Sequence, residues 1–296
     1  MACDPNTLLN DARCFTCLTE EQRAIINLYL LCQISGNTTP VVPINPVASG
    51  WAARVVVNGG ALPSNATILA FSNFLNCLDA AGLTSKMIAV NCFAPDSLIA
   101  AITPLIVGPG FDPWTNSGFL AAALTIDGLI GNNSNTLNSG IIPTRDFTSD
   151  SDCGITLYNM SAINESTNDV GSNSVTNLRT SISNNTTFAC WTSASGDTLS
   201  AANPSWTGYL SANRHGVNTQ VLYRAKSTVP HAVLGTRSAL ASTRPAFVFF
   251  VFGGPTVPCA RRLSFVAFHH GLTTAESSLF FNCVQAMRTA IGGGFL

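Results

Sequence analysis

The apolar run Phe247-Val248-Phe249-Phe250-Val251-Phe252 is the strongest indication of the fold class. It lacks polar alternation, which predicts a central strand buried on both faces. Outward from it, between about residue 125 and residue 268, short apolar runs recur roughly every ten residues between clusters of Gly, Asn, Ser and Pro. Examples are the runs 155–158, 221–223 and 263–268. This spacing predicts an antiparallel β-sandwich or barrel.

Charge is scarce along the chain. Only 10% of the 296 residues are Asp, Glu, Lys or Arg, and the formal net charge is −1. Ordinary soluble proteins have about 25% charged residues. The basic residues are scattered, so the sequence lacks the footprint of a nucleic-acid partner. We find neither a leader segment nor an apolar stretch long enough for a membrane span, and expect a product made in a cytosol without membrane insertion.

The N-terminal part is organised by a helix and a Pro-rich stretch. A capping box at 19–22 begins an amphipathic helix, whose apolar positions between 24 and 32 recur at helical spacing and which Gly36 ends. Residues 37–50 contain three prolines, which indicates an extended connector. We therefore predict a helical unit at 1–36, a linker at 37–50 and a sandwich domain at 51–296.

Further elements are predicted inside the large domain. Residues 51–57 favour a strand that ends in a turn at Asn58. Ser64 caps a helix near 64–81, and the apolar run 86–93 is typical of a buried strand. A second capping box, residues 273–276, opens a C-terminal helix. The predicted fold class is mainly β.

The order of these pieces resembles a family of phage and metagenomic virion proteins. The matching stretches are 51–58, 87–96, 124–137 and 265–291, within a resemblance that spans residues 45–296. It implies a concanavalin A-like, laminin G-like jelly roll, which is an antiparallel β-sandwich. At the terminus the family often has Gly-Arg after the last helix, whereas this chain has Gly292-Gly293-Gly294.

Residues 3–34 resemble an N-terminal module that precedes differing domains in tailed-phage structural proteins. Such reuse implies an anchor that docks cargo on a particle. The apolar residues proposed for assembly contacts are Leu8, Leu9, Phe15, Ile25, Leu28 and Leu31. Because the apolar face of the helix needs a partner, we also expect a homo-oligomer.

Cysteines and histidines are the candidate metal ligands in the sequence. Thiolates of Cys3, Cys14, Cys17 and Cys32 could hold a structural zinc or form disulfides, but packed free thiols are the competing interpretation. A reducing cytosol favours free thiols, and a particle released into oxidising surroundings could form disulfides later. His269 and His270 are adjacent in a predicted strand and therefore point to opposite faces, which favours a structural role.

The sequence contains no recognisable catalytic motif. A glycosidase of this fold needs two carboxylates across a groove, and Asp146, Asp150, Asp152, Glu165 and Asp169 lie in stretches that read as loops. The sequence also lacks the Gly-x-Ser-x-Gly elbow of serine hydrolases. We therefore expect a protein that is not an enzyme.

Carbohydrate binding is the alternative that the residue types leave open. A lectin-like site needs carboxylates or amides, sometimes with calcium, and an aromatic platform. Residues of these types are Trp191, Trp206, Tyr209, Asp150, Asp152 and Asn213. The competing interpretation places them in the core and in turns, because Trp is usually mostly buried.

These observations lead to a first functional hypothesis of a virion structural protein, such as a tail fibre, spike or capsid decoration subunit. It would be made in the host cytoplasm and would contact other virion proteins and further copies of itself. The alternative is a module that binds a host surface glycan for attachment. Neither hypothesis needs a cofactor beyond the zinc or calcium considered above.

Overall fold

The computed structural model describes residues 44–149, 152–161, 163, 168–172, 179–183, 186–190, 198–202, 207–216, 219–225, 231–236, 249–251, 253–254 and 257–293. The helical elements are α3 (Pro46–Val57), α4 (Asn65–Ala80), η1 (Thr84–Lys86), α5 (Leu98–Ile102), η2 (Ala121–Ala123), α6 (Pro143–Asp146) and α7 (Thr274–Ala290). The N-terminal unit predicted at 1–36 lies outside the described residues.

Within the described residues, most of the strands form two antiparallel sheets. Sheet A has the order β13-β12-β11-β6-β17-β4-β3, with β1 also paired to β17. These strands are β1 (Met87–Asn91), β3 (Leu124–Thr125), β4 (Gly128–Ile130), β6 (Asp152–Asn159), β11 (Gly208–His215), β12 (Thr219–Ala225), β13 (His231–Thr236) and β17 (Arg262–His269).

Sheet B has the order β10-β9-β8-β7-β14-β5-β2 and continues into β15 and β16. Its strands are β2 (Thr115–Ser117), β5 (Thr136–Asn138), β7 (Asn168–Ser172), β8 (Arg179–Ser183), β9 (Thr186–Cys190), β10 (Thr198–Ala202), β14 (Phe249–Val251), β15 (Gly253–Gly254) and β16 (Val257–Pro258). The pairing is antiparallel except for one bridge, between β15 and β7.

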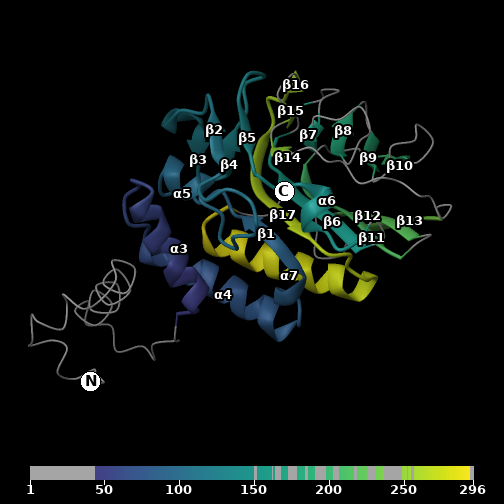
Figure 1. Ribbon diagram of the computed structural model, residues 1–296, viewed down its shortest axis with the longest axis horizontal. Helices are drawn as coiled ribbons and strands as arrows, with labels where there is room; N and C mark the ends of the chain where they lie inside the picture. Colours follow the sequence, from purple (N-terminus) through teal and green to yellow (C-terminus); the bar gives the residue numbers. More distant parts are fainter. Residues whose placement is uncertain are drawn as a thin grey trace, which may run out of the picture.

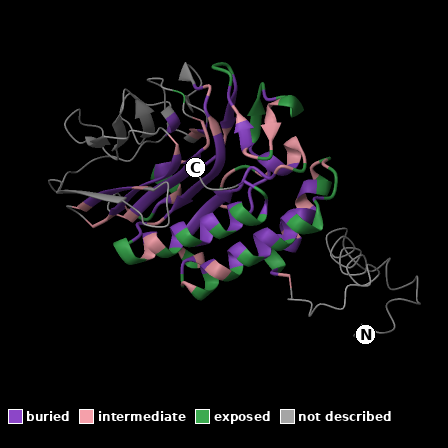
Figure 2. Ribbon diagram, turned by 180° about the vertical axis from the view of Figure 1, so that it is seen from behind, coloured by how far each residue is buried: buried purple, intermediate pink, exposed green. Residues whose placement is uncertain are grey.

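Sheet A is covered on both faces. Leu157, Leu210 and Val266 of sheet A share a hydrophobic core with Leu137 and Val170 of sheet B, so the two sheets pack as a sandwich. The alternate residues of the same strands belong to a second core, formed with α3, α4 and α7. Figure 1 shows these three helices together on the side of sheet A away from sheet B, and Figure 2 shows their buried sides turned toward it. The mainly β fold class is confirmed, with a helical layer added to the sandwich.

The register explains how one strand serves both cores. Tyr158 pairs with Tyr209 and with Phe265, and all three face the helices. One position earlier in β6, Leu157 pairs with Leu210 and with Val266, which face sheet B. Because side chains alternate between the faces of a strand, a strand buried on both sides must be apolar at successive positions. The run 263–268 in β17 has this character.

The segment predicted as a strand at 51–57 is helical, so that prediction was wrong. Helix α3 begins at Pro46, inside the stretch taken as a linker, and the Asn45 side chain caps it by accepting a hydrogen bond from Val47 N. Ala48, Trp51, Ala52 and Val55 are buried in the core next to α4, at the i, i+3, i+4 and i+7 spacing of a helix. This stripe outweighs the strand propensity of the valines at 55–57.

Other local predictions are confirmed. Helix α4 covers the predicted 64–81 region, and the Ser64 hydroxyl accepts a hydrogen bond from Thr67 N at 3.2 Å. Strand β1 is buried along its whole length. Thr273 and Glu276 form the reciprocal bonds of a capping box at the start of α7. Local signals of this kind fix where an element starts because they act within a few residues.

The run 247–252 is described only at 249–251, which is β14. It pairs with β5 on one side and β7 on the other, so it lies inside sheet B as predicted. Val251 is buried but Phe250 is half-buried, so the prediction of burial on both faces does not hold at Phe250.

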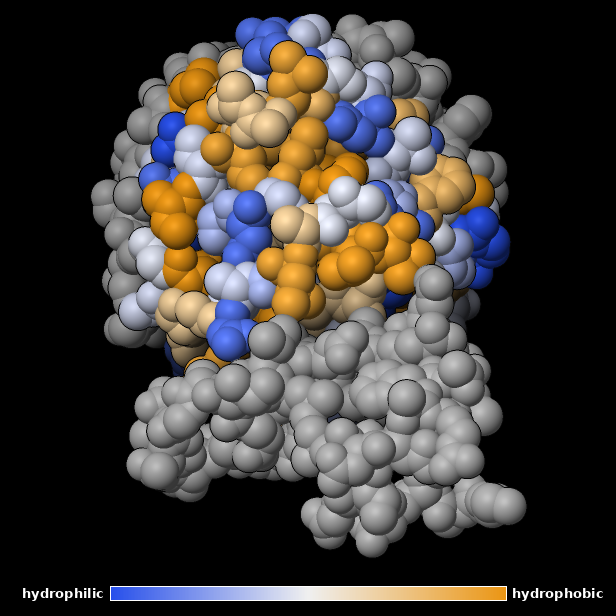
Figure 3. Space-filling view, turned by 90° about the vertical axis from the view of Figure 1, so that its left-hand side faces the viewer, coloured by the Kyte–Doolittle hydropathy of each residue, from blue (hydrophilic) through white to orange (hydrophobic). Residues whose placement is uncertain are grey.

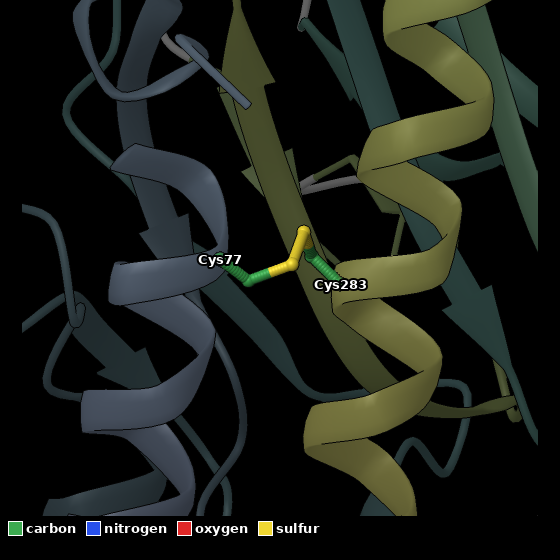
Figure 4. The surroundings of a disulfide bond; sticks show 2 residues. All are labelled: Cys77 and Cys283. Carbon is green, nitrogen blue, oxygen red and sulfur yellow. A yellow bond between two sulfur atoms is a disulfide. The ribbon is translucent and has the colours of Figure 1, made fainter. Parts of the chain in front are cut away.

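A disulfide between Cys77 and Cys283 joins α4 to α7, which lie side by side on the helical face of the sheet (Figure 4). The two cysteines are 206 residues apart in sequence and their Cα atoms are 5.7 Å apart. Cys92, Cys153 and Cys259 are buried. The sequence left the oxidation state and the pairing of the cysteines open, and the structure shows the pair that joins the helices to be oxidised.

Candidate functional site

Asp152, one of the predicted sugar-binding residues, lies at the first position of β6, not in a loop. Its Oδ1 accepts a hydrogen bond from Gly271 N at 2.8 Å, and its Oδ2 lies 3.1 Å from His270 Nδ1. A Cβ on Gly271 would come within 2.2 Å of Arg214 O, so only glycine fits where this turn crosses β11. Asp152 therefore holds the β17–α7 turn against the sheet.

Lys86 and Glu276 form an ion pair on the other side of the β17–α7 turn. Lys86 Nζ lies 2.7 Å from Glu276 Oε1, and both side chains are partly exposed. Burial alone would raise the pKa of Glu276, but hydrogen bonds from Lys86 and Thr273 outweigh it and the pKa is lowered. The carboxylate stays ionised and caps α7, which is a structural role.

A row of buried polar side chains lies next to this turn, between sheet A and α7. His269 Nδ1 is 2.7 Å from the His270 carbonyl oxygen, and His269 Nε2 is 2.9 Å from Thr156 Oγ1. Asn213 accepts a hydrogen bond from Leu272 N and donates one to Ser211 Oγ. Burial lowers the pKa of His269 to about 4, so the imidazole is neutral at physiological pH.

The predicted sugar-binding set does not come together in the described residues. Tyr209 and Asn213 are 1% and 0% exposed, so neither can meet a soluble ligand and both assignments were wrong. Tyr209 packs edge-on against Phe281 of α7, with ring centroids 5.1 Å apart. The helical layer covers the face of sheet A on which both residues lie. Asp150, Trp191 and Trp206 lie outside the described residues.

The carboxylates proposed for hydrolysis are also held in other roles. Asp169 lies in β7, is fully buried, and pairs with the buried Arg261 at 2.8 Å, which joins sheet B to the start of β17. Asp146 pairs with Arg145 and accepts a hydrogen bond from Ile142 N. Asp169 and Asp152 are strand residues, so the loop assignment was wrong for both. Glu165 lies outside the described residues.

Among the residues that the structure describes, we find no group of three or more His, Cys, Asp or Glu side chains that could hold a metal ion. The predicted zinc ligands Cys3, Cys14, Cys17 and Cys32 and the anchor residues Leu8, Leu9, Phe15, Ile25, Leu28 and Leu31 lie outside that part of the chain. No described helix is long and apolar enough to cross a membrane.

An open cavity of about 310 Å³ lies where the two sheets meet near β2 and β4. Its walls come from the β2–β3 and β4–β5 connections. The lining residues are Gly118, Leu120, Ala122, Ala123, Ile130, Gly131, Asn132 and Asn135. None of them is charged, so the cavity offers amides and aliphatic groups. Sequence analysis missed it because its residues are uncharged and come from two separate segments.

These features define an antiparallel β-sandwich with a disulfide-linked helical layer and a neutral cavity at the junction of its sheets. No family model matches the chain, and no curated protein does. Solved structures give only distant likenesses. Domain 4 of AbnA, an extracellular arabinanase from Geobacillus stearothermophilus in complex with arabinotriose, shares 14% identity over 68% of this chain and 98% of its own, with a TM-score of 0.46.

A mutant Trypanosoma rangeli sialidase that displays trans-sialidase activity shares 10% identity, with a TM-score of 0.47. That likeness covers 76% of this chain but 38% of the sialidase. An arabinofuranosidase complexed with arabinofuranosyl-alpha-1,2-xylobiose shares 11% identity over 61% of this chain and 46% of its own, with a TM-score of 0.37. Identities and TM-scores this low assign no function to this chain.

Proposed function

We propose that the chain is a non-catalytic attachment or assembly protein, a structural subunit of a virion such as a fibre, spike or decoration protein. The observation that carries the proposal is an apolar surface beside α3 and α5, which we call the α3–α5 face. Its exposed members are Val56, Val57, Leu62, Val107 and Phe111. Figure 3 shows hydrophobic side chains gathered on this side of the molecule.

Contacts between segments hold this face together. Arg54 of α3 donates a hydrogen bond to Pro104 O at 2.8 Å and lies 2.8 Å from Asp112 Oδ2. The end of α3 is therefore fixed beside the 104–112 loop, with Val57 67% and Phe111 46% exposed. Exposed apolar residues gathered in one region mark a surface that contacts another macromolecule. This supports a protein that works by contact with further copies of itself or with other virion proteins.

The experiment is size-exclusion chromatography with light scattering on the full chain and on the double variant Val57→Ser, Phe111→Ser. We expect an oligomer for the unmodified chain and a smaller species for the variant, because two apolar anchors of the contact are lost. Leu279→Ser is the matched control, since Leu279 is 45% exposed on α7. A monomeric unmodified chain at all concentrations would contradict self-assembly through this face.

Carbohydrate recognition for host attachment is the second candidate, and the neutral cavity favours it. A glycan array probed with the full chain tests this candidate separately. Binding to defined glycans would support attachment, and a blank array would remove the second candidate while leaving assembly in place.

A further inference from the structure

The cavity between the β2–β3 and β4–β5 connections has fixed walls. Gly131 N donates a hydrogen bond to Arg261 O at 2.9 Å, which ties the β4–β5 connection to the strand next to it. On the opposite wall, Phe119 N donates to Asn116 Oδ1 and Asn116 Nδ2 donates back to Phe119 O, both at 2.9 Å. A ligand would therefore meet a preformed site and lose little free energy in ordering it.

The amide groups in this cavity are oriented by one serine. Asn132 Oδ1 accepts hydrogen bonds from Ser134 N and Ser134 Oγ, and Asn135 Oδ1 lies 3.1 Å from Ser134 Oγ. The single hydroxyl proton of Ser134 reaches one of the two amide oxygens at a time, while Ser134 N holds Asn132 Oδ1. Within the described residues, neither Asn132 Nδ2 nor Asn135 Nδ2 donates a hydrogen bond, although Asn135 is only 5% exposed. The cavity lining therefore offers amide N–H donors from two residues, the buried Asn135 and the exposed Asn132.

Gly118 leaves space for the Asn135 side chain in the wall of the cavity. Its φ of +94° favours glycine, and a Cβ there would come within 2.8 Å of Asn135 Oδ1. The other wall is aliphatic, made of Leu120, Ala122, Ala123 and Ile130. The site therefore combines polar donors on one side with a C–H surface on the other.

We propose that this cavity binds one uncharged sugar residue, such as an unmodified hexose or pentose at the end of a glycan. Ring and hydroxyl oxygens would accept hydrogen bonds from Asn132 and Asn135, and the C–H face of the sugar would lie against Leu120 and Ala122. The volume of about 310 Å³ is at the small end of ligand sites, which suits a single sugar ring. This inference rests on the carbohydrate-recognition candidate above.

Because none of the lining residues is charged, the cavity should distinguish neutral sugars from acidic ones. A sialic or uronic acid would place a carboxylate in a site that holds no Lys or Arg among its lining residues. Desolvating that carboxylate without a cation is unfavourable. The site therefore prefers neutral over acidic sugars, and its binding is insensitive to salt because no ion pair is involved.

The test compares three forms of the full chain by glycan array, followed by calorimetric titration with the neutral sugar that gives the strongest signal. Ala122→Phe places a ring in the cavity. Ala121→Phe is the matched control, because Ala121 is an exposed neighbour in η2 that does not line the cavity. Asn135→Ala removes one donor, and we expect it to weaken binding about 3- to 10-fold.

We expect the unmodified chain and Ala121→Phe to bind neutral glycans equally and Ala122→Phe to lose binding at least about tenfold. If Ala122→Phe binds as well as the control, the sugar site lies elsewhere and the cavity inference is overturned, while carbohydrate recognition stands. Preference for acidic glycans also overturns it. If no glycan binds any form, both the cavity inference and the carbohydrate-recognition candidate fail.

Discussion

Asp169 and Arg261 form a fully buried ion pair between the sheets. Breaking this pair should therefore cost more stability than breaking an exposed one. Asp169→Ala leaves the Arg261 guanidinium buried without its carboxylate, so we expect a loss of about 3–5 kcal/mol in the free energy of unfolding. Asp127→Ala is the control, because Asp127 pairs with Arg262 where both side chains are about one third exposed. That pair should contribute less than about 1 kcal/mol. Urea denaturation measures the loss of stability in both variants, and equal losses would contradict this prediction.

His269 links stability to pH. Its pKa is about 4 in the folded protein because of burial, against about 6.5 for an unfolded histidine. At pH values between these two pKa values, His269 is protonated in the unfolded chain and neutral in the folded chain. The stabilisation is complete above pH 6.5 and is lost as the pH falls toward 4, by up to about 3 kcal/mol.

Urea denaturation between pH 4.5 and 7 tests this prediction. His269→Gln should flatten the pH dependence, because glutamine does not titrate. The unmodified chain, measured over the same pH range, is the reference for the slope. A slope that persists in His269→Gln would show that other groups carry the pH dependence.

At the scale of elements, the Cys77–Cys283 disulfide fastens α4 to α7 across 206 residues of sequence. Cross-links that close long loops restrict the unfolded chain most, and their removal commonly lowers stability by about 2–5 kcal/mol. We expect the double variant Cys77→Ser, Cys283→Ser to show this loss in denaturant unfolding. Adding reductant should destabilise the unmodified chain and leave the variant unaffected. A reductant effect of equal size on both would locate the redox sensitivity elsewhere.

For the whole molecule, the decisive feature is that sheet A serves two cores. Phe265 faces the helices and Val266 faces sheet B, and both are fully buried. Phe265→Ala should lower stability by about 3–5 kcal/mol and Val266→Ala by somewhat less, since fewer atoms are removed. Because one sheet joins both cores, we expect each variant to keep a single cooperative transition. Circular dichroism and tryptophan fluorescence should coincide, and separate transitions would show that the helical layer unfolds independently.

The mainly β class, the buried strand β1 and the starts of α4 and α7 could all be predicted from the sequence. These features depend on strand spacing, on apolar runs and on caps at Ser64 and Thr273, all of which act over a few residues. It also contained the helical stripe of α3, although the valines near its end led to a strand prediction. Local patterns of this kind are legible because neighbours in sequence are neighbours in space.

Which faces of the strands are covered could not be predicted without the three-dimensional packing. Alternation shows that Tyr209 and Asn213 share a face of their strand, but it cannot show that helices lie over that face and remove both from solvent. The partner of Cys77 and the walls of the neutral cavity were equally hidden. Each of these depends on packing between segments far apart in the chain, where the interaction is set by geometry that residue spacing does not encode.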